Sequence, residues 1–165
     1  MILEGNAKKF GDNISTDLIA PGRLFHLRNN LPELAKHVLE DAEPNFYEKI
    51  QKGDFIVAGR NFGLGSSREH APAIIKIAGI GAILAQSVAR IFFRNAINVG
   101  LPVFECDTNQ IDAQDHLRLD VLKGTVENLS KKISLPFHPL PKIMVDILND
   151  GGLVAHIQKH GGFKL

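Results

Sequence analysis

Three short apolar segments, separated by stretches with helical periodicity, constrain the fold of this chain more than any other feature. The apolar segments are Asp54–Ala58, Gly81–Ala85 and Leu101–Phe104, and each has the length and composition of a buried strand. Apolar residues recur at helical spacing in the intervening residues 67–78 and 89–98. Strands that alternate with helices at this spacing pair in parallel through right-handed crossovers. The centre of the chain therefore predicts a parallel sheet with crossover helices.

The flanking segments predict an opening strand, further helices and an antiparallel region. Asn30 is placed to cap a helix over Leu31–Glu40, and Gly100 is placed to end the second crossover helix. Ser15–Ile19 favours an extended conformation at its end. We expect residues 1–165 to form one α/β domain with a mainly parallel central sheet and an added antiparallel region. The other predicted elements are the strands Ile2–Phe10, His116–Leu122, Thr125–Leu129 and Lys132–Leu135, and the helices Pro141–Asn149 and Gly152–Lys159.

Composition and charge narrow the possible classes of function. The net charge of +1 and the lack of a basic stripe argue against a protein that binds nucleic acid or a membrane surface. The longest nearly continuous apolar run, Ile77–Ala85, is shorter than the roughly 20 residues of a transmembrane helix, and the first residues do not resemble a secretion signal. The single cysteine, Cys106, excludes an internal disulfide and fits a reducing cytoplasm. One thiol cannot hold an iron–sulfur cluster in the usual way, so we expect Cys106 to be a small buried apolar residue.

The glycine-rich segment Gly59–His70 has the strongest chemical signal in the chain. Gly63 and Gly65 allow a sharp turn and a close approach of the backbone to a ligand. Two serines and an arginine follow, and we expect them in the first turn of a helix that begins near Ser67. The N–H groups and the dipole at a helix start favour bound anions. The segment therefore predicts a site for a carboxylate or another small anion.

Other interpretations of this segment are simpler or fit less well. Ser66 or Ser67 could merely cap the helix, with Glu69 or His70 completing a local hydrogen-bond network. A dinucleotide fingerprint needs a third glycine where Arg68 stands, and the chain lacks the Gly-Lys-Ser/Thr and Gly-x-Ser-x-Gly sequences of phosphate loops and serine hydrolases. A regulatory module that binds a carboxylate or a phosphate is therefore a second class of function.

Three motifs in a fixed order resemble the swivelling domain of the aconitase superfamily. They are GDNISTD at Gly11–Asp17, NFGLGSSREHA at Asn61–Ala71 and ARIFFRNAINVGLP at Ala89–Pro102. The chain length and the order of the motifs are similar to those of the free-standing small subunits in the 3-isopropylmalate dehydratase group. The resemblance is close over about residues 5 to 105 and loose in the tail. It implies a single swivelling β/β/α domain.

The resemblance also implies an active site shared with a large iron–sulfur subunit. In this family a 4Fe-4S cluster on the large subunit binds the substrate hydroxyl as a Lewis acid, so we expect this chain to bind no cofactor and no metal. Ser66 would remove a proton from the neighbouring carbon, while Ser67 and Arg68 would hold a carboxylate of a small di- or tricarboxylic acid. The implied reaction is the isomerisation or dehydration of a malate-type acid by a heterodimer or a dimer of heterodimers.

Arg28 is the residue that the resemblance places nearest the variable part of the substrate. A loop arginine can grip a carboxylate through two hydrogen bonds, although an exposed arginine without such a role is a simpler interpretation. The neighbouring Phe25–Leu27 matches neither the isopropyl-binding nor the homoaconitase-like members cleanly, and Leu64 stands where the family often has a cysteine or another residue. Substrates of the 3-isopropylmalate, homoaconitase and dimethylmalate dehydratase types are therefore all candidates.

Four further polar residues have weaker signals. The resemblance places Asp17 near the active cleft, behind the substrate-binding residues, although an Asx-turn is equally consistent. His70 is expected to form a hydrogen bond at a helix start. His156 and His160 have a spacing that a metal would accept, but two ligands without a carboxylate are weak support, and we expect a solvated helix face.

Overall fold

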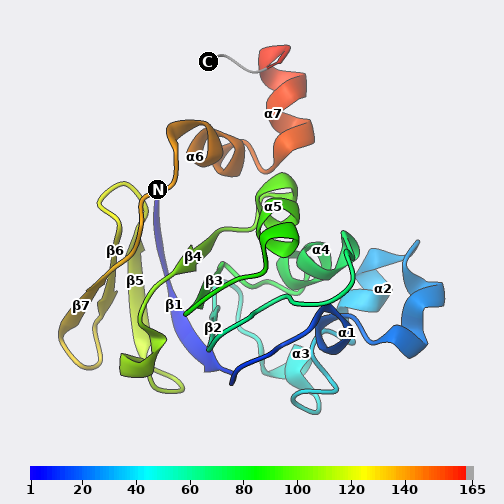
Figure 1. Cartoon of the computed structure of the whole chain (residues 1–165), viewed down its shortest axis with the longest axis horizontal. Coiled ribbons are helices and arrows are strands. Elements are labelled where there is room, and N and C mark those ends of the chain that lie inside the picture. The colour runs from blue at the N-terminus through cyan, green and yellow to red at the C-terminus, as the bar shows by residue number, and fades with distance from the viewer. Residues whose placement is uncertain (163–165) are drawn as a thin grey trace.

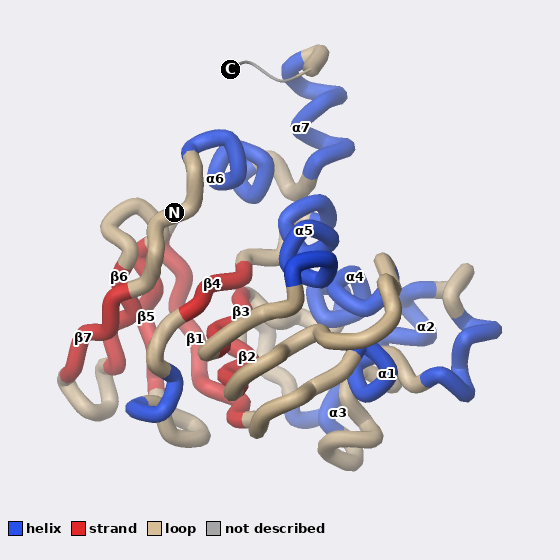
Figure 2. The backbone as a smooth tube through the Cα atoms, viewed as in Figure 1, coloured by secondary structure: helices blue, strands red, loops and turns tan. Residues whose placement is uncertain are grey.

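The computed structural model describes residues 1–162 as an α/β fold built on one seven-stranded sheet (Figures 1 and 2). The strands are β1 (Ile2–Lys9), β2 (Phe55–Ala58), β3 (Ala82–Ala85), β4 (Val103–Glu105), β5 (His116–Asp120), β6 (Thr125–Asn128) and β7 (Ile133–Pro136). They lie in the order β4-β3-β2-β1-β5-β6-β7 across the sheet. The first strand of the chain therefore forms the middle of the sheet.

The parallel part of the sheet contains the three buried strands predicted from the sequence. β1 pairs with β2, β2 with β3 and β3 with β4, all in parallel. Alternate residues of β2 pack on opposite faces: Ile56 belongs to one hydrophobic core, and Phe55 and Val57 belong to another. Both faces are covered, which explains why β2 and β3 are continuously apolar rather than alternating.

The antiparallel addition is also present and extends the same sheet. β5 pairs with β1, β6 with β5 and β7 with β6, each in antiparallel orientation. The predicted hairpin turns at Lys123-Gly124, where Gly124 has a φ of 69° and its carbonyl accepts a hydrogen bond from the N–H of Phe137. The predicted fold class, a parallel sheet with an antiparallel region, is confirmed.

The helices pack mainly around the parallel part of the sheet, with α1 to α5 on the side away from β5–β7 (Figure 1). They are α1 (Thr16–Ile19), α2 (Leu31–Ala35), α3 (Phe46–Lys49), α4 (His70–Ile77), α5 (Arg90–Val99), α6 (Lys142–Asn149) and α7 (Leu153–His160), with the 3-10 helices η1 (Gly22–Leu27) and η2 (Thr108–Gln110). α5 ends as predicted at Gly100, whose φ is 80°. Among residues 1–162, none of the helices combines the length and the apolar content that a bilayer crossing requires.

Two sequence predictions near the N-terminus are wrong in detail. Residues 16–19 form α1 rather than an extended segment, because the Ser15 hydroxyl accepts a hydrogen bond from Leu18 N–H and caps a helical turn. The helix predicted to reach Glu40 ends at Ala35. Leu39 has a φ of 54° and donates its N–H to the Ile19 carbonyl, so a long-range contact turns the chain there. Asn30 does cap α2, through Glu33 N–H.

Candidate functional site

The glycine-rich loop runs from the carboxyl end of β2 to the start of α4, between two other loops at the same edge of the sheet. Gly63 N–H donates to the Ile14 carbonyl at 2.7 Å, and Thr16 N–H donates to the Leu64 carbonyl at 2.9 Å. On its other side, the Phe62 carbonyl accepts the Ala89 N–H at 2.9 Å. The carboxyl edge of parallel strands is where α/β folds bind ligands, and the three sequence motifs meet there.

Gly63 allows this loop to pack tightly against α5. Its φ is 77°, and a Cβ at this position would lie 2.2 Å from Cγ of Phe92. The Phe92 ring is itself held edge-on against Phe62, with ring centroids 5.3 Å apart. The glycine is therefore required both by the backbone conformation and by the close approach of α5.

The loop and α5 enclose a cavity of about 340 Å³. Ser66 and Ser67 are exposed at this cavity, and the Ser66 carbonyl accepts a hydrogen bond from the buried Thr16 hydroxyl at 2.9 Å. The structure thus brings together the three predicted residues Ser66, Ser67 and Arg68. The cavity lining is Thr16, Gly63, Gly65, Ser66, Ser67, Arg68, Ala89, Arg90, Ile91, Phe92 and Asn95.

The helix start at this cavity belongs to α5, not to α4. The sequence predicted a helix from about Ser67, but α4 begins at His70, and Ser67 and Arg68 have no regular secondary structure. Neither serine caps α4, because its N-cap residue is Glu69 and makes no side-chain capping bond. α5 likewise has no side-chain cap, and its first turn lines the cavity. Its free N–H groups and positive dipole end therefore provide the anion-favouring field that the sequence assigned to α4.

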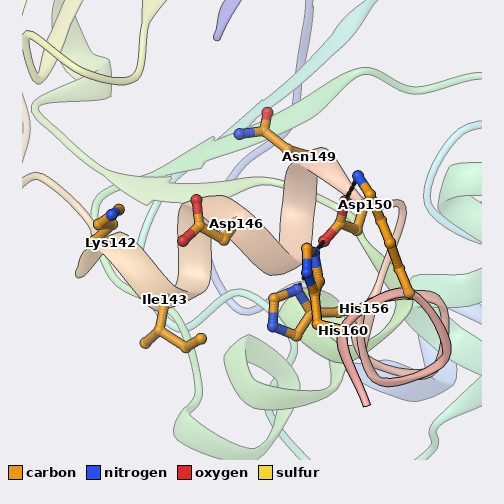
Figure 3. A pocket seen from close by; sticks show the side chains of 8 residues that line it. Lys142, Ile143, Asp146, Asn149, Asp150, His156 and His160 are labelled. Carbon is orange, nitrogen blue, oxygen red and sulfur yellow. Dashed lines mark hydrogen bonds and ion pairs between the residues drawn. The ribbon is translucent and has the colours of Figure 1, made fainter. Parts of the chain in front are cut away.

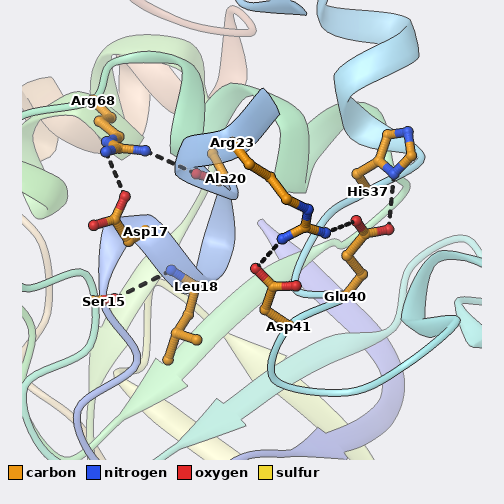
Figure 4. A network of polar contacts seen from close by, with 9 residues as sticks. All are labelled: Ser15, Asp17, Leu18, Ala20, Arg23, His37, Glu40, Asp41 and Arg68. Carbon is orange, nitrogen blue, oxygen red and sulfur yellow. Dashed lines mark hydrogen bonds and ion pairs between the residues drawn. The ribbon is translucent and has the colours of Figure 1, made fainter. Parts of the chain in front are cut away.

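Arg68 is held in place by the segment around α1 (Figure 4). Its guanidinium donates to the Ala20 carbonyl at 2.9 Å and forms an ion pair with Asp17. The Arg68 side chain is 17% exposed, whereas the Asp17 side chain is 65% exposed. A guanidinium has five N–H donors, so two fixed contacts leave others for a carboxylate. Asp17 thus lies behind Arg68, where it can orient that side chain.

Arg28 and His70 lie beside the cavity without lining it. The Arg28 guanidinium stacks on the Phe25 ring, 4.2 Å from its centroid, and the Phe25 ring meets the His70 ring edge-on at 6.1 Å. Burial, followed by the positive charges of Arg68 and Arg28, lowers the pKa of His70. The neutral form of His70 is therefore favoured, and the positive charge in this region comes from Arg28, Arg68 and the cavity-lining Arg90.

Asn95 is a candidate site residue that the sequence interpretation did not single out. It lies on α5, the residue is 8% exposed, and it lines the cavity. Within residues 1–162 its side-chain amide makes no hydrogen bond. The amide atoms are accessible from the cavity, so they can donate to and accept from a ligand there. The available signal was a polar residue on the buried face of an otherwise apolar helix pattern.

The Cys106 thiol is in an apolar, buried environment, unlike a typical metal-binding thiolate. Cys106 is buried, as predicted, and burial raises the pKa of its thiol to about 12. The residue follows β4. Burial therefore favours the protonated thiol, and Cys106 lies outside the lining of the cavity.

These features define a class of protein: an α/β domain that presents hydroxyls, a fixed arginine and a helix start at one cavity suited to an anion. The sequence profile of the aconitase C-terminal domain matches residues 5–108. The 3-isopropylmalate dehydratase small subunit 2 of Archaeoglobus fulgidus is 59% identical over 165 residues, which is all of both chains. The small subunit 1 of Thermotoga maritima is 59% identical over 98% of both chains.

A solved structure agrees with these sequence matches. The 3-isopropylmalate dehydratase (leuD) of Methanocaldococcus jannaschii has a TM-score of 0.92 and 42% identity, over 98% of this chain and 96% of that chain. This chain belongs to the 3-isopropylmalate dehydratase small-subunit family of aconitase C-terminal domains. The resemblance seen in the three sequence motifs is thereby confirmed.

Proposed function

We propose that this chain is the substrate-binding small subunit of a hydro-lyase that moves a hydroxyl between neighbouring carbons of a malate-type acid. The first candidate substrate is 3-isopropylmalate. The observation that carries the proposal is the convergence of Ser66, Ser67 and Arg68 on one cavity with the uncapped start of α5. The names of the relatives, which are 3-isopropylmalate dehydratase small subunits, support the same activity.

Ser66 is the proposed base that removes the proton next to the hydroxyl-bearing carbon. A serine hydroxyl is a very weak acid, so its alkoxide must be stabilised by donors and positive charge fixed in advance. The first turn of α5 offers N–H donors at the same cavity, and Arg68 offers a positive charge. Ser66 lies in a loop held by the Thr16 hydroxyl, which limits its motion.

Ser67 and Arg68 are the proposed carboxylate-binding residues. The carboxylate would complete the hydrogen-bonding capacity of Arg68 that Asp17 and the Ala20 carbonyl leave unused. Arg28 is the proposed contact to the variable end of the substrate, since its guanidinium lies exposed beside His70. His70 is a supporting residue that keeps Phe25, and through it Arg28, in position.

A large partner subunit is the second part of the proposal. The serines are exposed, and Ile91 in the cavity lining is 45% exposed, so a partner that covers this face would bury apolar surface and exclude water. We expect the 4Fe-4S cluster to be held by that partner, because Cys106 is the single thiol of this chain and one thiol cannot hold a cluster in the usual way. The heterodimer, or a dimer of heterodimers, is the assembly to test.

The test compares Ser66→Ala and Ser67→Ala with the matched control Ser134→Ala, an exposed serine on β7. Each variant is mixed anaerobically with the large subunit, and the turnover of 3-isopropylmalate is measured. Loss of a general base predicts that kcat falls about 10³-fold for Ser66→Ala, with normal folding. Ser67→Ala should mainly raise KM, and Ser134→Ala should change neither constant.

Near-normal turnover of Ser66→Ala would contradict the assignment of the base. A regulatory carboxylate- or phosphate-binding module predicts a different pattern: the large subunit would be fully active alone, and this chain would only bind the anion. Rates on homoaconitate and dimethylmalate, measured on the same complex, decide among the candidate substrates.

A further inference from the structure

A second cluster of polar and ionisable side chains lies between α6 and α7 (Figure 3), and its cavity shares no lining residue with the proposed active site. Asp150 follows α6, and His156 and His160 lie one turn apart on α7. His156 Nδ1 is 2.7 Å from Asp150 Oδ2, and His160 Nε2 is 2.9 Å from the same oxygen. The expected solvated helix face is wrong for His156, whose side chain is 5% exposed.

The three residues match the ligand set of a zinc site. One donor atom from each, a carboxylate oxygen and two imidazole nitrogens, lies within 4.8 Å of the others. Zinc bonds to such atoms at about 2.0 to 2.2 Å, so small rotations of the side chains would place all three around one ion. Two histidines at i and i+4 on a helix are a spacing that zinc proteins use.

The surroundings leave room for an ion with an open coordination position. The cluster forms one wall of a cavity of about 630 Å³, which Asp146 and Asn149 also line. Water or a further oxygen ligand could therefore complete a tetrahedral site. The Asp150 side chain is 7% exposed, and a buried carboxylate of this kind needs neutralising partners.

We propose that Asp150, His156 and His160 form a binding site for a divalent transition-metal ion, with zinc the best match, that ties α7 to the end of α6. Binding would replace the two imidazole–carboxylate hydrogen bonds and release a proton wherever a ligating nitrogen carries one. The Lys159 ammonium competes with the ion for Asp150, because Lys159 Nζ lies 2.6 Å from Asp150 Oδ1. The site is independent of the proposed catalytic function and of any cluster on the partner.

The simpler alternative is a clasp without a metal ion, in which His156, Lys159 and His160 all interact with the Asp150 carboxylate and so hold α7 against the end of α6. The two hypotheses differ in what removal of Lys159 does. A clasp without a metal loses one of its contacts. A metal site loses a positive charge beside the ion, so its affinity for zinc rises.

The experiment titrates the purified full chain with zinc chloride near neutral pH, by calorimetry and by thermal unfolding. We expect one saturable ion per chain, and a rise in Tm of about 5 to 10 °C when free zinc is roughly 100 times Kd. His160→Ala and Asp150→Asn should each weaken binding by at least about 100-fold, since both remove a ligand. His138→Ala, at an exposed histidine outside the cluster, is the matched control and should bind as the parent chain does.

Lys159→Ala should tighten zinc binding about 10-fold, since a positive charge near the ion is removed. His160 is the safer ligand variant because its side chain is 32% exposed, so its loss leaves the fold intact. The absence of saturable binding would overturn the proposal. So would binding that His160→Ala and Asp150→Asn leave unchanged, or binding that Lys159→Ala weakens.

Discussion

Gly63→Ala tests whether the loop that carries Ser66 depends on contact with α5. A Cβ at residue 63 would lie 2.2 Å from Cγ and 2.5 Å from Cβ of Phe92, far inside normal contact. Phe92 is 2% exposed and packs on the fully buried Phe62, so it has little space to move. Overpacking of this kind costs about 1 to 3 kcal/mol, and the positive φ adds about 1 to 2 kcal/mol for a residue with a Cβ.

Gly161→Ala separates these two contributions. Gly161 has a φ of 70°, close to that of Gly63, but a Cβ there would meet no atom within 4 Å. The control therefore carries the backbone strain without the clash. We expect urea denaturation to give an unfolding free energy about 2 to 5 kcal/mol lower for Gly63→Ala, against about 1 to 2 kcal/mol lower for Gly161→Ala.

Activity gives a second readout of the same change. Because the alanine would push the loop away from α5, turnover of the complex should fall in Gly63→Ala and stay normal in Gly161→Ala. Equal losses of stability in the two variants would refute the clash. A destabilised Gly63→Ala with unchanged turnover would refute the link between loop position and the serines.

Three further predictions concern single side chains. Asp17→Ala should raise KM about 3- to 10-fold at near-constant kcat, because the substrate then has to order the Arg68 side chain. Steady-state kinetics measures both constants. An unchanged KM would show that Arg68 does not need Asp17 to hold it in place. The same variant should lose less than about 1 kcal/mol of stability, since Asp17 is 65% exposed. Asn95→Leu should lower kcat/KM about 10-fold. Denaturation should show equal or higher stability, because the substitution removes no hydrogen bond within the fold. Full activity of the variant would exclude Asn95 from the site. Cys106, whose pKa is raised to about 12, should react with a thiol reagent near pH 8 at least about 100-fold more slowly in the native chain than in urea, and equal rates would contradict its burial.

The sequence predicted the elements of the parallel sheet well because their signals are local. β2 and β3 are short, fully apolar runs, and both lie where the pattern placed them. Gly100 ended α5 as predicted, since a glycine adopts the left-handed C-cap conformation readily, although the close approach of Gly151 to Gly100 could not be read from the local pattern. The helix boundaries failed where distant contacts intervene. The Arg68 guanidinium is hydrogen-bonded to the Ala20 carbonyl, 48 residues away in the chain, and Ser67 and Arg68 lie outside α4.

The candidate site was predicted in part for the same reason. Ser66, Ser67 and Arg68 are adjacent in the chain, so one loop necessarily carries all three. The resemblance to a known family supplied Asp17 and Arg28, and the structure places both near Arg68 or His70. Asn95 lay outside the prediction, because its burial at the cavity depends on how α5 packs against the loop.

The sequence by itself determined the alternation of strands and helices, the apolar core positions and the loop with the paired serines, because periodicity and glycine placement act over a few residues. Only the tertiary structure decided which helix start faces those serines, since α4 follows them in the chain but α5 meets them in space. It also decided that His156 is buried beside Asp150 rather than solvated. Both outcomes depend on contacts between elements, and the free energy of such contacts is set by packing geometry that no single segment contains.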